Sequence, residues 1–558
     1  MKKRQRIILI VLGIIIFIAI ILGFSANTIV KSKLKNYIAN DLPENIEITY
    51  KDLNVHTLSG DLSADNLYVL IKDKETGIAI SKFDLDNFQI ENVSLMSYLF
   101  GKKINIEEIL FDGLKITHYN SKKEQEDKPS KKKERKDIPI SIETINFKNA
   151  SVTIYENRQD TVLFSSERIN FSIHDVLYNK ETSTRNIPIE YKDHSFEANG
   201  IYVKTGPYNT ISINKLTNKD KFLSIIDIHF NTKYTKKELS KIIPFEKDHY
   251  KASADSIIFS NFDFGLNNDV FFLRTDVISV NNAVAYIYRD KLVKDDVTLK
   301  EAFPKSIRNL PLSLTIDTLL VSNSKIHYSQ RKILGNKEGK LEIDIKKATI
   351  SNLSNTYKSP EKTTILVDGT FLRNSPYHVN WSFDVNNKKD EFEFIGDIGK
   401  FTGGDLNVFI TPIVNAKLKG EIDHTIFKII GNNKTSMIYM SQKFKKIKIE
   451  VLNKKKKENK FISSIANVII HTNSGSKKGE YNHITTDAKR DHTKAFFNFL
   501  VLNLKAAFKV SFVEKKNKKY KNNKKQKVHI DLKKHHEQHL KNKKKRLKKR
   551  AAKQHNKH

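Results

Sequence analysis

Apolar and charged positions divide the chain into a short apolar segment, a long region of alternation and a basic end. Residues 7–24 carry no charge, and a helix over these 18 residues would span ~27 Å, close to the hydrocarbon thickness of a bilayer. Four basic residues precede the segment, and by the positive-inside rule they keep the N-terminus in the cytoplasm. We therefore predict a cytoplasmic segment over 1–6, a transmembrane helix over 7–24, and a chain that lies otherwise outside the cytoplasm.

The alternative for this segment is a cleaved signal peptide. Gly23-Phe24-Ser25 has the small-x-small pattern of a cleavage site. A signal peptide needs only ~7–15 apolar residues, however, and this run is longer and rich in isoleucine throughout. The length favours a retained single-pass anchor.

The periodicity changes twice after the anchor. Within residues 25–44, apolar residues from Ile29 to Ile38 recur at helical spacing and stop before Pro43, which predicts an amphipathic helix next to the membrane. From Ile46 onward apolar and polar residues alternate, as in Ile226, Ile228 and Phe230. This pattern predicts a β-rich body over 45–490.

Four segments of the body repeat one local pattern. In each, two alternating apolar residues precede a turn-like pair, and the alternation then resumes in the opposite phase. A phase slip of this kind needs a turn or a bulge, and Gly and Asn tolerate the positive φ that it requires. The pairs are Asp112-Gly113, Lys148-Asn149, Asn281-Asn282 and Ser322-Asn323.

Helical signals are sparse in the body. Thr235 and Glu238 form a capping-box signature for a short helix that stops at Pro244. Residues 120–137 contain no large apolar residue and predict a flexible surface loop. Residues 491–512 predict an amphipathic helix that docks on a membrane interface. Its candidate docking residues are Phe496, Phe499, Leu500, Leu504 and Phe508.

These elements predict a mainly β fold, a long twisted antiparallel sheet forming an open groove with few short helices. An apolar sheet face must be covered, and the visible helices are too few to cover this one. Acyl chains could cover it, at ~0.8 kcal/mol per buried CH₂. The alternative is a sheet folded on itself with a dry core. The candidate apolar positions of the groove or core are Ile109, Phe111, Ile145, Phe147, Val152, Ile278, Val280, Leu319, Val321 and Ile326.

Charge is concentrated at the C-terminus. Residues 515–558 hold 20 Lys or Arg against Asp531 and Glu537, a net charge of +18, and the other 514 residues carry +17 of the total of +35. We expect the tail over 513–558 to be disordered or helical, and it either is merely solvated or contacts an anionic surface. Its extracytoplasmic position argues against nucleic acid. The candidate anionic-surface contacts are Lys543, Lys544, Lys545, Arg546, Lys548, Lys549 and Arg550.

Catalytic and metal-binding signals are weak. The chain has no cysteine, which excludes disulfides, thiol catalysis and cysteine-ligated metals. The histidines of residues 535–539 (HHEQH) lie in the basic tail without a supporting shell, and no nucleophile or phosphate-binding motif appears. We therefore expect no enzymatic activity, no cofactor and no metal site.

Short motifs in order along the chain resemble the AsmA-like family of Gram-negative envelope proteins. They begin with Tyr50-x-Asp52-Leu53-x-Val55, Leu58-x-Gly60-x-Leu62 and Asn66-Leu67-x-Val69, and continue with Val93-Ser94-Leu95 and the segment Ile104–Ile116. The C-terminal half contributes Asn407-x-Phe409-Ile410-x-Pro412, Gly420-Glu421, Gly431-Asn432, Lys477-Lys478-Gly479 and residues 490–499. The motifs cover nearly the whole chain, and their order is more specific than any one of them.

The resemblance implies an inner-membrane protein whose periplasmic bulk forms a β-groove. Its expected partners are phospholipid acyl chains, the inner membrane, and the inner leaflet of the outer membrane or other envelope proteins. The function it implies is to bind or conduct phospholipids between the two membranes and so to support outer-membrane homeostasis. The alternative is a structural or assembly factor that binds outer-membrane proteins through exposed sheet edges.

Overall fold

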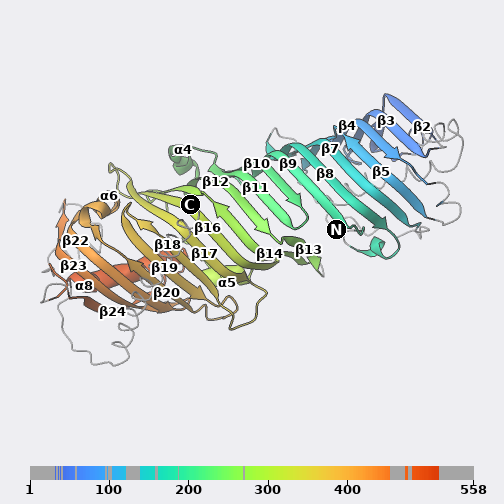
Figure 1. Cartoon of the computed structure of the whole chain (residues 1–558). Coiled ribbons are helices and arrows are strands. Elements are labelled where there is room, and N and C mark those ends of the chain that lie inside the picture. Colours follow the sequence, from blue (N-terminus) through green and yellow to red (C-terminus); the bar gives the residue numbers. More distant parts are fainter. Residues whose placement is uncertain are drawn as a thin grey trace, which may run out of the picture. The chain divides into compact units, whose positions relative to one another are not determined.

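The computed structural model describes residues 42–452, apart from 57–58, 95–96, 98–102, 121–137, 157–160, 186–187 and 268–269, and then residues 472–475 and 480–513 (Figure 1). Four isolated positions, Ser32, Asn36, Ile38 and Asn40, are also described. The described residues are mainly β, with 62% in strands and 12% in helices, as the alternation predicts. The chain divides after Phe230 into two units, unit 1 and unit 2.

Strands make up nearly all of unit 1. β1 and β2 both pair with β3, and the order then runs through β4, β5 with β6, β7, β8, β9 and β10. A single 3₁₀ turn, η3 (Thr182–Thr184), follows β8, and β11 crosses the division between the units. The strands are β1 (Ile46–Thr49), β2 (Asp52–His56), β3 (Asp61–Lys72), β4 (Ala79–Glu91), β5 (Ile104–Asp112), β6 (Lys115–Asn120), β7 (Ile140–Glu156), β8 (Val162–Tyr178), β9 (Asp193–Lys204), β10 (Asn209–Lys219) and β11 (Phe222–Thr232).

The described residues of unit 2 form further β-strands and four helices. Its pairing order is β12, β14 with β15, β16, β17, β18, β19, β20, β22, β23 and β24, with β13 paired to β14 and β21 to β22. The strands are β12 (Asp248–Ser260), β13 (Asp263–Asn267), β14 (Val270–Asn281), β15 (Val284–Asp290), β16 (Ser313–Arg331), β17 (Gly339–Ser354), β18 (Thr363–Phe371), β19 (Ser375–Phe383), β20 (Phe392–Ile398), β21 (Phe401–Thr402), β22 (Ala416–Gly431), β23 (Thr435–Val451) and β24 (Asn482–Lys489). The helices are α4 (Lys236–Ile242), α5 (Phe303–Arg308), α6 (Gly403–Val414) and α8 (Phe496–Val513).

The four repeated segments form kinked strands that pair in parallel. β5 and β6 pair in parallel with β7, and β14 and β15 pair in parallel with β16, within a sheet that is otherwise antiparallel as predicted. The second residue of each turn-like pair has positive φ: 72° at Gly113, 52° at Asn149, 53° at Asn282 and 49° at Asn323. The strand continues in the same direction past that residue, so a kink and not a reversing turn absorbs the phase slip. A shift of register accompanies the kink between β7 and β8, at Phe147 to Ala150.

The two parallel pairs have the same hydrogen bonds at the kink. The Gly113 N–H donates to the Lys148 carbonyl over 3.0 Å, and the Asn282 N–H donates to the Ser322 carbonyl over 3.1 Å. Each unit therefore contains one copy of the same construction. An Asn or Gly is needed there because other L-residues lose ~1–2 kcal/mol in the left-handed region.

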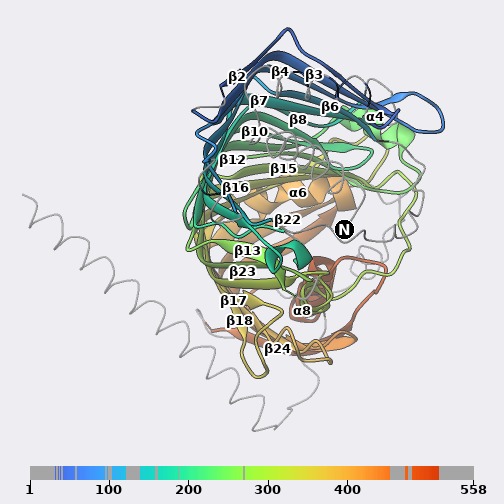
Figure 2. The ribbon, with the colours of Figure 1, turned by 90° about the vertical axis from the view of Figure 1, so that its right-hand side faces the viewer.

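The helices of unit 2 lie where local signals and apolar contacts place them. The capping box of Thr235 and Glu238 is formed at α4, and this helix ends at Ile242 as predicted. The predicted C-terminal helix is α8, which begins at Phe496 and packs against β23 and β24. Figure 2 shows α6 and α8 beside the strands of unit 2. α6 packs on β17 and β22.

Most of the predicted membrane segments lie outside the residues that the structure describes. Within the described residues, no helix combines the length and apolar composition that a bilayer crossing requires. The predicted anchor at 7–24, the loop at 121–137 and the tail from 514 onward lie outside those residues. The predicted helix at 25–44 is largely outside them too, although its four isolated described positions have helical backbone.

Candidate functional site

One face of the unit 2 sheet carries two continuous rows of apolar side chains, and we call it the ladder face. Hydrogen-bonded neighbours are in register from β12 to β24, so each row crosses ten strands. Only Thr486 and Gly396 interrupt the rows, and the ring of Phe427 occupies the space over Gly396. Row 1 is Phe259, Ile278, Leu319, Ile350, Ile365, Trp381, Phe394, Ile429, Ile438 and Thr486, and row 2 is Ile257, Val280, Val321, Ala348, Val367, Val379, Gly396, Phe427, Met440 and Ile484.

The two ends of these rows differ in how well they are covered. On β22 and β23, Ile429, Ile438 and Met440 have no solvent exposure. On β14 to β18 most row members are only partly buried, including Leu319, Val321 and Val367. The ladder face therefore has a covered part and a partly open part.

Helix α8 covers the C-terminal part of the rows. Its residue Phe496 stacks on Trp381 of β19 at 5.4 Å between ring centroids, while the same helix packs along β24. Those two strands are four spacings apart, or ~19 Å along a flat sheet, and the 18 residues of α8 are ~27 Å long. The helix therefore reaches from β24 to β19. Helix α5 adds Phe303, whose ring lies 5.2 Å from that of Trp381.

Unit 1 carries a comparable row built from phenylalanines. The rings of Phe88, Phe111, Phe147, Phe171 and Phe196 follow one another across β4, β5, β7, β8 and β9 at centroid distances of 5.2, 4.5, 6.0 and 6.3 Å. The first two rings are buried, and the last three are partly exposed. Cross-strand aromatic pairs stabilise a sheet.

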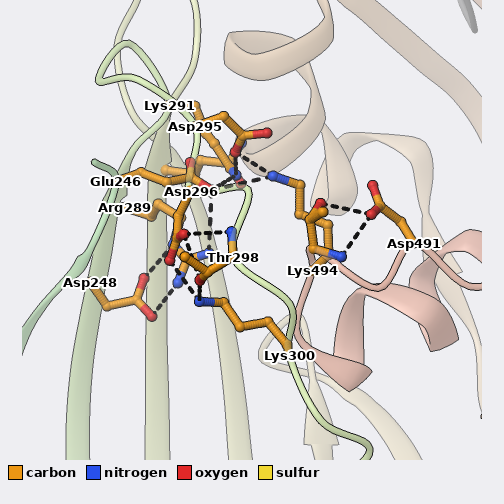
Figure 3. Close-up of polar contacts among 12 residues, drawn as sticks. Glu246, Asp248, Arg289, Lys291, Asp295, Asp296, Thr298, Lys300, Asp491 and Lys494 are labelled. Atoms are coloured by element: carbon orange, nitrogen blue, oxygen red, sulfur yellow. Dashed lines mark hydrogen bonds and ion pairs between the residues drawn. The ribbon is translucent and has the colours of Figure 1, made fainter. Parts of the chain in front are cut away.

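A charged cluster holds the segment that leaves β15, which we call the strap (residues 291–302). Figure 3 shows its centre, Glu246, whose side chain is 4% exposed. Its carboxylate accepts a hydrogen bond from Lys291 at 2.6 Å and lies 3.7 Å from Lys494 in the β24–α8 linker. Lys494 also pairs with Asp295 in the strap.

Backbone contacts fix the strap in addition to the charges. The Glu246 N–H donates to the Lys294 carbonyl at 2.8 Å, and the Lys300 N–H donates to the His492 carbonyl at 2.7 Å. The guanidinium of the buried Arg490 donates to the carbonyls of Lys300 and Glu301 at 2.8 and 3.0 Å. Burial lowers the pKa of Arg490. The cluster thus joins three segments that are distant in sequence.

Burial and hydrogen bonding shift the pKa of several groups in this region. Burial raises the pKa of Tyr288 to about 12. Burial also opposes ionisation of Asp290, but the hydrogen bonds from Arg331, the Leu292 N–H and Ser240 together outweigh it, and the pKa of Asp290 is lowered. No group of three or more metal-ligating side chains occurs in the part of the chain that the structure describes.

Six of the ten predicted apolar positions fall on these rows, including Phe111 and Phe147 in the phenylalanine row of unit 1. Ile278, Val280, Leu319 and Val321 belong to rows 1 and 2, and Ile326 lies beyond the kink of β16. In unit 1, Ile109, Phe111 and Ile145 are core residues, with Phe147 packed against them and Val152 partly buried beyond the kink of β7. Whether any of them contacts a ligand stays a prediction.

The predicted docking residues of α8 lie in the core of unit 2. Phe496, Phe499 and Leu500 are buried at 6, 1 and 6% exposure, and Leu504 and Phe508 pack against the same cluster. Their apolar face is therefore turned to the sheet, and membrane docking through them stays a prediction that requires the helix to leave it. The seven candidate tail residues, Lys543 to Arg550, lie outside the described residues.

Sequence reasoning missed α5, α6 and the charged cluster. The signal for α6 was present, because Thr402 and Asp405 form a capping box at its start. Pro304 in the first turn of α5 is a weaker signal. The cluster has no local signal, since Glu246, Lys291 and Lys494 meet only in the folded chain.

Comparison with known proteins adds no relative: no family model matches the chain, and no curated protein sequence matches it significantly.

Proposed function

We propose that this protein binds phospholipid acyl chains along the ladder face and conducts them between the inner and outer membranes of a Gram-negative envelope. In this proposal the predicted anchor at 7–24 holds the chain in the inner membrane, with its bulk in the periplasm. The protein would act without catalysis, and the AsmA-like resemblance of its motifs points to the same role. The ladder face would then be the lining of an open groove.

The observation that carries the proposal is the partly open section of rows 1 and 2. Val321, Val367 and their neighbours on β14 to β18 form an unbroken apolar strip that no helix of the described residues covers fully. Leaving such a strip in water is unfavourable by ~25 cal/mol per Å² of apolar surface. Acyl chains suit it because they are apolar, flexible and able to slide along a surface without specific contacts.

Photo-crosslinking at two adjacent residues tests the proposal. Val367 belongs to row 2, whereas Leu366 precedes it on β18, points to the opposite face and is 38% exposed. A photoreactive residue at position 367 should crosslink to lipid in membranes, and one at position 366 should not. Equal lipid crosslinking at both positions, or lipid-free protein after mild isolation, would contradict the proposal.

A photoreactive residue on β24, the last described strand of the sheet, addresses the alternative of an assembly factor. Such a factor would bind other proteins through its sheet edges. Crosslinks to envelope proteins from β24, with none to lipid at position 367, would favour that role.

A further inference from the structure

The two flanks of the unit 2 sheet meet at the charged cluster. Nine strand-to-strand steps separate β12 from β24, which amounts to ~43 Å along a straight sheet. Glu246 lies two residues before β12 and Lys494 five residues after β24, and these seven residues reach at most ~25 Å. The two side chains are too short to close the remaining gap, yet they lie 3.7 Å apart. The sheet is therefore curved, and its flanks approach each other.

The strap crosses between the two flanks on the side of the ladder face. It begins where β15 ends and leads into α5, whose Phe303 packs on Trp381 of the ladder face. Along its length, the Lys294 carbonyl accepts a hydrogen bond from the segment before β12, and the Lys300 N–H donates to the His492 carbonyl after β24. Figure 3 shows the charged strap residues between the two flanks. The strap therefore ties one flank of the curved sheet to the other.

Polar contacts hold the strap, and three of its apolar side chains stay largely in solvent. Their exposed fractions are 41% for Leu292, 66% for Val297 and 81% for Leu299. The attachments are the ion pairs of Lys291 and Asp295 and the backbone hydrogen bonds. A segment with few buried apolar contacts opens locally at a lower free energy than the core beside it. The strap can therefore detach without exposing much new apolar surface.

The charged attachment of the strap is only partly satisfied. Glu246 pairs through one carboxylate oxygen with Lys291 and Lys494. Its other oxygen, Oε2, is buried and accepts no hydrogen bond from the described residues. A buried acceptor without a partner is unfavourable, so this attachment is weaker than a fully paired carboxylate would make it.

We propose that the strap is a gate, latched by Glu246, through which phospholipid acyl chains reach the ladder face from the side. This inference rests on the proposed function and adds the route by which the lipid enters. With the latch closed, the strap ties the flanks together and blocks the path between them. With the latch open, the flanks are free to separate. The exposed Val297 and Leu299 favour an acyl chain as the ligand, because its passage removes their apolar surface from water.

A disulfide between the strap and the β24 flank tests the gate. The chain has no cysteine, and Lys300→Cys with His492→Cys places a pair where a backbone hydrogen bond of 2.7 Å already joins the two residues, as close as a disulfide needs. Phospholipid with brominated acyl chains is added to the full-length protein in detergent, and quenching of Trp381, the only tryptophan, reports its arrival at the ladder face. The oxidised double variant, checked by a free-thiol assay, should lose this quenching, and a reductant should restore it.

Further variants separate the gate from other effects of substitution. Each single cysteine variant should be quenched equally with and without reductant. Glu246→Gln removes the latch and should be quenched faster than the wild type, whereas Glu181→Gln, which removes an exposed pair with Arg185 in unit 1, should not.

The outcomes distinguish the gate from the proposed function. Equal quenching of the oxidised and reduced double variant would overturn the gate alone. A wild-type rate in Glu246→Gln would overturn the role of Glu246 as its latch. A wild type in which brominated lipid never quenches Trp381 would overturn the proposed function and the gate with it.

Discussion

Trp381 of β19 and Phe496 of α8 lie face to face, with their ring planes within 5° of parallel. This contact joins the first turn of the last described helix to a strand four spacings away from β24, the strand that the helix follows in sequence. It keeps α8 on the ladder face, where the helix covers the C-terminal part of rows 1 and 2. The open section of those rows is what remains uncovered.

Removing the Phe496 ring should loosen α8. Phe496→Ala is expected to lower the free energy of unfolding by about 3–5 kcal/mol, the range for deleting a buried aromatic side chain. Phe497→Ala changes a residue that is 62% exposed and should cost less than about 0.5 kcal/mol. Urea unfolding followed by tryptophan fluorescence compares them directly, since Trp381 is the only tryptophan. Equal effects would show that the stack does not hold the helix.

The carboxylate of Glu246 should hold the strap (residues 291–302) in its folded position. Glu246→Gln leaves Lys291 and Lys494 without their shared carboxylate, and breaking a buried ion pair costs about 3 kcal/mol or more. Hydrogen exchange of residues 291–302 should become faster. The matched control is Glu301→Gln, which removes an exposed pair with Lys305 and should be nearly neutral. An unchanged exchange rate in Glu246→Gln would mean that the backbone hydrogen bonds hold the strap in place without these ion pairs.

The strap should also respond to acid. The hydrogen bond from Lys494 lowers the pKa of Asp295, so Asp295 releases its proton more easily in the folded chain than in the unfolded chain. Its stabilising effect is therefore present above the unfolded pKa of about 3.9 and is lost as the pH falls through the lower, folded value. Thermal unfolding at pH 6 and pH 3 should show a smaller difference in Asp295→Asn than in the wild type. The same difference in both would exclude this contribution.

The kinks require residues that adopt the left-handed backbone conformation. Asn323 has a φ of 49°, so Asn323→Ala should cost about 1–2 kcal/mol, whereas Asn323→Gly should stay within about 0.5 kcal/mol of the wild type. Urea unfolding gives both values. Ser322→Ala, at the neighbouring position, controls for the loss of a polar side chain. If Asn323→Gly were as destabilised as Asn323→Ala, the side chain and not the backbone would matter at this position.

Local chemistry explains what the sequence could predict. The alternation, the capping box at Thr235 and the positive φ of Gly113, Asn149, Asn282 and Asn323 all depend on residues close together in the chain. The sequence also showed the phase slip, but not whether the strand reverses or continues at that point. A reversing turn and a kink need the same residue types, and only strand pairing decides between them.

Long-range contacts explain what the sequence could not predict. The apolar face of α8 has the pattern of a membrane-docking helix, because a bilayer and a sheet select the same amphipathic face. Helix α6 was missed since Gly403, Gly404 and Pro412 are poor helix formers, yet contacts with β17 and β22 support it. The pairing of Glu246 with Lys494 has no signal at all before the chain folds.

Lys505 should destabilise the folded chain. The pKa of Lys505 is lowered in the folded chain, so its charged form is less favourable there than in the unfolded chain. Lys505→Gln should therefore melt at the same or a higher temperature than the wild type at pH 7, and the difference should shrink as the pH approaches the ordinary lysine pKa of about 10.4. Lys445 gives the opposite case, because its hydrogen bond with Glu421 raises its pKa. It stabilises the fold below the unfolded pKa and loses that effect as the pH rises through the folded value, so Lys445→Gln should lower the melting temperature at pH 7. A Lys505→Gln variant that is less stable than the wild type at pH 7 would mean that Lys505 makes a stabilising contact in the folded chain.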